Sequence, residues 1–164
     1  MGQWLSDVVH AAGASEVHLI GHSQGFLIAL EATPYLQNKV KSISAIGTAA
    51  AIPVNPALIE TAEKSSAQAA SMMLQWGFGQ AAHMGISAVP GMQPIGIGNE
   101  IMSSNPLAQD LIACNNYQRG RERTQALDVP ALVQLAQQDK MTPLKQGLKP
   151  VSYTHLTLPT ICSV

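Results

Sequence analysis

Residues 17–25 read Val17-His18-Leu19-Ile20-Gly21-His22-Ser23-Gln24-Gly25. The first four residues form a short, mostly apolar run that is typical of a strand, and no helix breaker follows Gly25 until Pro34. We therefore expect a strand, a sharp turn at the serine, and a helix. A further helix is expected over residues 3–12, because apolar residues recur there at helical spacing and Gly13 follows.

Two more strands are expected along the chain. Residues 40–47 are rich in β-branched side chains, and residues 129–136 form another apolar run. A helix between the first two strands favours parallel pairing, because parallel strands need a long crossover connection. The pattern predicts an α/β fold with a partial doubly wound, mostly parallel sheet.

The segment between the second and third expected strands is rich in Ala, Met, Gly and Pro. One helix is expected over residues 56–76, and residues 107–114 and 120–127 are also predicted to be helical. Residues 77–99 hold six glycines and two prolines, which predicts a long loop that forms a lid or binding surface. We expect a helical lid insertion over about residues 48–127, within a partial domain that spans residues 1–150.

Composition and charge narrow the classes of function. The 164 residues are 46% hydrophobic and 12% charged with a net charge of -1, as is typical of a globular protein. Without runs of Lys or Arg, neither a nucleic-acid binder nor a polybasic membrane anchor is expected. Gly and Pro interrupt the apolar stretches well before the roughly eighteen residues of a membrane span. The N-terminus has no basic region followed by an apolar one, so a cytoplasmic protein is expected.

Metal and cofactor sites are not expected. Cys114 and Cys162 are too far apart in sequence for a C-x-x-C motif, and no His, Cys, Asp or Glu cluster has metal-ligand spacing. His18 is expected to be a core histidine on one face of the first strand, whereas His10 is expected on a solvated helix face. His83 lies in the glycine-rich segment, where contact with substrate is an open alternative, and nothing in its spacing makes it a ligand.

The segment from Gly21 to Gly25 fits the pattern G-x-S-x-G of a nucleophile elbow, with a strand before it and a helix after it. Small residues are expected at Gly21 and Gly25 because a side chain there would crowd the neighbouring strand or helix. The strained turn aims the Ser23 hydroxyl outward, and the Gln24 N–H at the helix start can bind an oxyanion. His22 is expected to line the pocket or to pack against the sheet. The alternative is an ordinary serine in a glycine-rich turn.

These features resemble the α/β-hydrolase family, in which a serine, an acid and a histidine follow one another along the chain. The resemblance covers about residues 3–148 and rests on the elbow and on the segment Leu135-Ala136-Gln137-Gln138-Asp139-Lys140-Met141-Thr142-Pro143. It implies that Asp139 is the acid that orients a histidine and stabilises its imidazolium. Ala136 stands where many members have glycine. A helix N-cap or a solvated carboxylate is the alternative for Asp139.

Two parts of the family's active site have no counterpart in this sequence. Intact members have several strands before the elbow and a loop that supplies a second oxyanion N–H, whereas one expected helix precedes Val17. The family histidine follows the acid by a helix and a strand, whereas 25 residues follow Asp139, with His155 as their one histidine. Residues 151–160 resemble translated sequencing adapter, so residues 151–164 are expected to be a non-native tail and His155 is not expected to be catalytic.

The expected function is that of a cofactor-free, esterase-like or lipase-like serine hydrolase acting on an ester or a similar small acyl substrate. The chain itself is expected to be an incomplete and inactive fragment. An acyltransferase and a non-catalytic binder of small apolar ligands remain open, because one fold hosts many chemistries. A truncated product without a stable fold is a further alternative, since a sheet without its early strands exposes an edge.

Overall fold

The computed structural model describes residues 1–87 and 89–148, which form two compact units. The first unit contains Met1–Ile52, Gln118–Leu135 and residues 144–148. The second unit contains Pro53–Tyr117 and Ala136–Pro143. The expected non-native tail, with His155, lies outside the described residues.

The first unit is built on a parallel sheet whose three strands lie in chain order, β1-β2-β3. The strands are β1 (Val17–His22), β2 (Val40–Ile46) and β3 (Ala131–Gln134). The predicted α/β class and parallel pairing are confirmed. β3 begins later than expected and directly follows Pro130, a residue that has no N–H to donate to a neighbouring strand.

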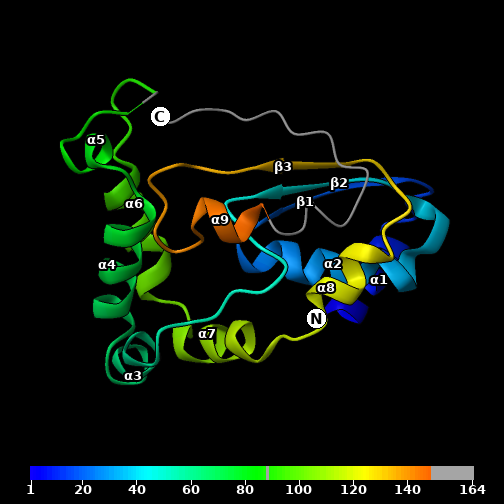
Figure 1. Cartoon of the computed structure of the whole chain (residues 1–164), viewed down its shortest axis with the longest axis horizontal. Helices are drawn as coiled ribbons and strands as arrows, with labels where there is room; N and C mark the ends of the chain where they lie inside the picture. The colour runs from blue at the N-terminus through cyan, green and yellow to red at the C-terminus, as the bar shows by residue number, and fades with distance from the viewer. Residues whose placement is uncertain (88, 149–164) are drawn as a thin grey trace. The chain divides into compact units, whose positions relative to one another are not determined.

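Helices cover one face of this sheet. The helix α2 (Gln24–Leu36) packs against β1 and β2, and α1 (Gly2–Ala11) packs against α2 (Figure 1). Leu30 of α2 is fully buried. The unit also contains a short 3-10 helix, η1 (Gln37–Lys39), and the helices α8 (Gly120–Gln125) and α9 (Leu144–Gly147). The α1 and α2 helices confirm the two helices expected around the first strand.

Side chains along β1 alternate between buried and exposed positions, as a strand with one covered face requires. Leu19 is buried, whereas Ile20 is 71% exposed. The prediction of a core position for His18 is wrong, because this residue lies on the exposed face, with its Nδ1 2.7 Å from Ser42 Oγ. The alternation of a strand is present in the sequence, but the sequence does not tell which face the helices cover.

The helix α2 continues through Pro34, where a helix end was expected. Proline has no N–H, so it leaves the Leu30 carbonyl one turn earlier without its usual backbone donor. The Thr33 hydroxyl donates to this Leu30 carbonyl at 2.9 Å. A neighbouring side chain thus replaces the hydrogen bond that Pro34 removes.

The second unit is helical over the residues described. Its helices are α3 (Pro56–Lys64), α4 (Ser66–Gly77), α5 (Gln80–His83), α6 (Pro94–Ser103) and α7 (Leu107–Asn116). Its core contains buried side chains from α3, α4 and α7: Leu58, Ala62, Ala69, Ala70, Leu107 and Leu111. The lid role expected for this region remains a prediction.

The single helix expected over residues 56–76 is wrong, because Ser65 breaks it into α3 and α4. Ser65 has extended backbone angles, φ -158° and ψ 104°, and its hydroxyl accepts a hydrogen bond from the Gln68 N–H at 3.3 Å. A serine that caps the next helix competes in this way with continuation of the preceding one.

The long loop expected over residues 77–99 is also wrong, because α5 lies within it and α6 begins in it. Gly98 lies inside α6 and packs on Leu74 of α4: a Cβ added to this glycine would lie 2.5 Å from Leu74 Cδ2. This glycine therefore permits two helices to approach closely, a use that composition cannot distinguish from a loop. Among all the helices described, none is both long and apolar enough to cross a membrane.

Candidate active site

Ser23 occupies the turn between β1 and α2 and has a backbone conformation that few non-glycine residues adopt. Its φ is 50° and its ψ is -123°. The Ser23 N–H donates to the Ile46 carbonyl at 3.0 Å, and its own carbonyl accepts a hydrogen bond from the Phe26 N–H at 3.1 Å. Such strain persists only where the surrounding structure fixes the backbone. The sharp turn expected at this serine is present.

Thr48 also holds this turn, although the sequence had not singled it out. Its hydroxyl donates to the Ser23 carbonyl at 2.9 Å, and its side chain is fully buried. Thr48 follows the end of β2 by two residues, and β2 is the strand that pairs with β1. A hydroxyl residue just beyond the neighbouring parallel strand is a sequence signal that could have identified it.

The two glycines of the elbow differ in their surroundings. A Cβ added to Gly21 would lie 2.7 Å from the Gly25 carbonyl carbon and would overlap the backbone N and Cα of Phe26. A Cβ added to Gly25 would meet no atom within 4 Å among the described residues. The expected crowding is therefore present at Gly21 and wrong at Gly25.

Gln24 and His22 lie on either side of Ser23 at the strand-to-helix turn. Gln24 is the first residue of α2, at the positive end of the helix dipole. His22 ends β1 with an exposed side chain. Oxyanion binding by Gln24 and pocket lining by His22 remain predictions.

Asp139 belongs to the second unit, whereas Ser23 belongs to the first. The Asp139 carboxylate closes a turn of its own: Oδ1 accepts from the N–H groups of Met141 at 2.8 Å and Thr142 at 3.0 Å. Oδ2 accepts from the Thr142 hydroxyl at 2.7 Å. Both carboxylate oxygens are therefore oriented within this turn. The role of Asp139 as the acid remains a prediction.

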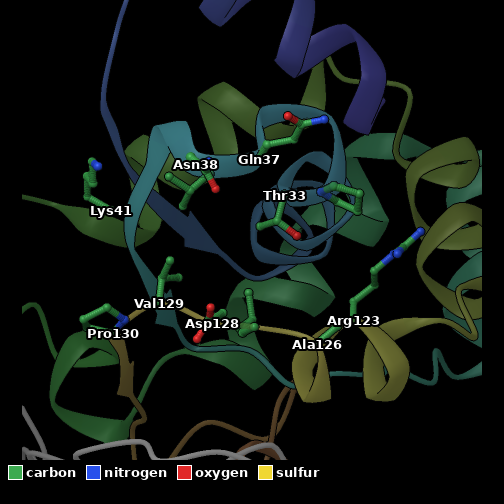
Figure 2. Close-up of a pocket in the computed structure, with 12 residues that line it drawn as sticks. Thr33, Gln37, Asn38, Lys41, Arg123, Ala126, Asp128, Val129 and Pro130 are labelled. Atoms are coloured by element: carbon green, nitrogen blue, oxygen red, sulfur yellow. The ribbon is translucent and has the colours of Figure 1, made fainter.

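A cavity of about 710 Å³ lies in the first unit and involves none of the predicted site residues. Figure 2 shows Thr33 and Asn38 on one side of it and Asp128, Val129 and Pro130 on the other. Its lining includes Val40, where β2 begins, whereas Ser23 follows the end of the parallel strand β1. The cavity is thus at the opposite ends of the strands from the elbow. Ligands of such sheets usually bind at the carboxyl ends, so we do not assign this cavity to the candidate active site.

Metal binding and a second nucleophile are two kinds of chemistry that the other described side chains could supply. No three His, Cys, Asp or Glu residues within 1–87 and 89–148 are grouped so that they could hold a metal ion. Burial raises the pKa of the Cys114 thiol to about 11, and the nearby Asp110 charge adds to this rise. The thiol is therefore protonated near neutral pH and is a poor nucleophile.

No family model matches the chain, and no curated protein matches it. Solved structures are similar over nearly its whole length. An esterase from Exiguobacterium antarcticum is 19% identical with a TM-score of 0.77, and the match covers 98% of this chain and 63% of that one. A hydrolase from Oleispira antarctica is 17% identical with a TM-score of 0.77, and the match covers 99% and 63%. A thermophilic esterase from Thermogutta terrifontis is 16% identical with a TM-score of 0.75, and the match covers 97% and 61%. This chain thus spans less than two thirds of the length of each, and the similarity shows a common fold.

Proposed function

We propose that this chain, which has the α/β-hydrolase fold, is part of a serine hydrolase that acts on an ester or a similar small acyl substrate. Similar structures named as esterases and hydrolases support a hydrolase role. The specific serine chemistry is argued from this chain's own residues. The helices of the second unit are proposed to form a lid over the acyl group, because their composition is apolar and methionine-rich.

In the proposed reaction, Ser23 Oγ attacks the substrate carbonyl carbon while a histidine of the intact parent protein, other than His155, takes the hydroxyl proton. Asp139 holds this histidine in the required orientation. The Gln24 N–H donates to the oxygen on which negative charge develops, with support from the dipole of α2. Departure of the alcohol leaves an acyl-serine, which water then hydrolyses.

The observation that carries this proposal is the backbone conformation of Ser23 at a strand-to-helix turn. An ordinary serine has no need of φ 50°, and three hydrogen bonds at the turn hold the backbone there. Strained non-glycine residues cluster at functional sites, and a nucleophile elbow uses this strain to expose its hydroxyl. In the structural alternative, an ordinary glycine-rich turn, a glycine would have the positive φ, because glycine adopts it without strain.

The test compares the 164-residue chain with the longer reading frame obtained by resequencing the source DNA on both sides. We expect the 164-residue chain to be nearly inert toward p-nitrophenyl butyrate, because His155 is not proposed to act as the base. We expect the longer protein to hydrolyse this ester and to lose at least about a thousandfold in kcat on Ser23→Ala. Ser44→Ala, on the neighbouring strand β2, is the matched control and should remain active.

Activity that survives Ser23→Ala would refute the proposal. A longer protein that binds a small apolar ligand with equal affinity before and after Ser23→Ala, and that turns over no ester, would indicate a non-catalytic binder instead. Adding an alcohol acceptor separates hydrolysis from acyl transfer, because a transferase would give a new ester in place of the free acid.

A further inference from the structure

Thr142 contacts Asp139 more extensively than any other residue described. Its hydroxyl donates to one carboxylate oxygen at 2.7 Å and its backbone N–H donates to the other at 3.0 Å. Thr142 is 3% exposed, so these donors are shielded from water that would compete for them. Hydrogen bonds to a charged group are stronger than neutral ones and become stronger still where water is excluded.

Among the described residues, the hydrogen bonds to Asp139 occupy only part of its carboxylate. An ionised carboxylate has about four acceptor positions, two on each oxygen. The turn fills both positions of Oδ1, through Met141 and Thr142, and one position of Oδ2. The remaining position on Oδ2 receives no donor from residues 1–87 or 89–148 and can accept a further one.

The turn is itself seated on the helices of the second unit. The Lys140 N–H donates to the Trp76 carbonyl at the end of α4 at 2.9 Å, which satisfies one of the carbonyls that a helix end leaves without a partner. Gln138 Oε1 accepts from the Gln80 N–H at the start of α5 at 3.1 Å. Met141 packs against the core of the unit. The residues on both sides of Asp139 are therefore fixed to α4 and α5.

We propose that Thr142 is a positioning residue for Asp139: it fixes the rotation of the carboxylate so that Oδ2 receives the N–H of the histidine. This inference rests on the function proposed above. It adds that the hydroxyl of Thr142 is required and that α4 and α5 support the acid, in addition to the lid role proposed above. A valine at this position would keep the shape of the side chain and lose the bond to Oδ2.

The test measures the Asp139 turn directly in the 164-residue chain and needs no enzymatic activity. Amide hydrogen exchange at the Met141 N–H and the carbon-13 shift of the Asp139 carboxyl are recorded for Thr142→Val, Thr142→Ser and Asp139→Asn. Thr61→Val is the matched control, because it removes a threonine hydroxyl that donates to the Ala57 carbonyl in the same unit. The double variant Asp139→Asn with Thr142→Val closes a cycle that isolates the coupling between the two side chains.

We expect Thr142→Val to speed exchange at the Met141 N–H about tenfold and to shift the Asp139 carboxyl signal. Thr142→Ser should restore both, and Thr61→Val should change neither. In the Asp139→Asn background, Thr142→Val should have at most a twofold effect. An unchanged Met141 rate in Thr142→Val, or an equal effect with and without the Asp139 carboxylate, would overturn the inference.

If Thr142→Val does not fold, the remaining variants decide. Faster exchange at the Met141 N–H in Asp139→Asn, together with a normal rate in Thr142→Ser, supports the positioning role of Thr142. Equal rates in wild type and Asp139→Asn overturn it. These results are independent of the ester assay, so a wrong positioning role and a wrong hydrolase function would be told apart.

Discussion

Replacing Gly21 with alanine should destabilise the first unit strongly, whereas the same change at Gly25 should not. The new Cβ at position 21 would lie 2.7 Å from the Gly25 carbonyl carbon and closer still to backbone atoms of Phe26. Ordinary van der Waals contacts of a Cβ atom begin at about 3.4 Å. The start of α2 would therefore have to move away from β1 by roughly 1 Å in a close-packed interior. The atoms concerned are backbone atoms, so no rotamer change relieves the overlap.

The magnitude follows from this geometry. Overpacking a core costs about 1–3 kcal/mol, and we expect the upper end, about 3 kcal/mol, because a helix must shift. This free energy corresponds to about a hundredfold change in the unfolding equilibrium. Gly25 lies in the first turn of α2 with open space around the added Cβ among the described residues, so Gly25→Ala should be neutral or stabilise by up to about 1 kcal/mol.

Amide hydrogen exchange at Ile43 is the assay. Its N–H donates to the Pro130 carbonyl at 3.0 Å in the central strand, so its exchange reports opening of the sheet. We expect exchange about a hundredfold faster in Gly21→Ala and no faster in Gly25→Ala. The Ala69 N–H, which donates to the Ser65 carbonyl in the second unit, is the internal control. A rate for Gly21→Ala within threefold of wild type would refute the claim that α2 starts in direct contact with β1.

Three further predictions concern single side chains. Thr48→Val removes the hydroxyl donor to the Ser23 carbonyl and should destabilise the first unit by about 1 kcal/mol. We expect faster amide exchange at Ile43, which Thr48→Ser should largely reverse. An unchanged rate with valine would show that this hydrogen bond contributes nothing. Ser65→Ala removes the cap of α4 and should lower the free energy of unfolding by about 1 kcal/mol in a urea titration followed by circular dichroism, and an unchanged midpoint would contradict this. In a Cys162→Ser background, Cys114 should react with a disulfide reagent at pH 8 about a hundredfold more slowly than a free cysteine. The rate of this reaction should increase as the pH rises toward the Cys114 pKa of about 11. Rapid reaction at neutral pH would disprove the burial of the thiol.

Much of the first unit was predictable because its signals are local. A strand followed by glycine, serine and glycine, then by a helix without breakers, is encoded within residues 17–36, and the structure has these elements. The parallel pairing of β1 with β2 follows from the helix between them, since a short turn cannot connect parallel strands. The residues of the elbow and the turn around Asp139 are likewise visible as short motifs.

Other features depend on what a residue meets in space. Gly98 and the glycines of the elbow look alike in sequence, yet their surroundings differ. Gly98 of α6 permits close contact with Leu74 of α4, and Gly21 of β1 permits close contact with Phe26 of α2. An added Cβ at Gly25 meets nothing within 4 Å among the described residues. Composition predicted a loop around Gly98 because glycine is common both in loops and at close helix contacts.

The sequence by itself determined the α/β class, the parallel strands and the serine at a strand-to-helix turn, because alternation, breakers and motif spacing act over a few neighbouring residues. The tertiary structure alone decided that His18 is exposed, that Thr48 holds the Ser23 carbonyl, and that the turn around Asp139 rests on α4 and α5. Each of these depends on contacts between segments far apart in the chain. Such contacts are fixed by packing and by the pairing of buried polar groups, which no local pattern records.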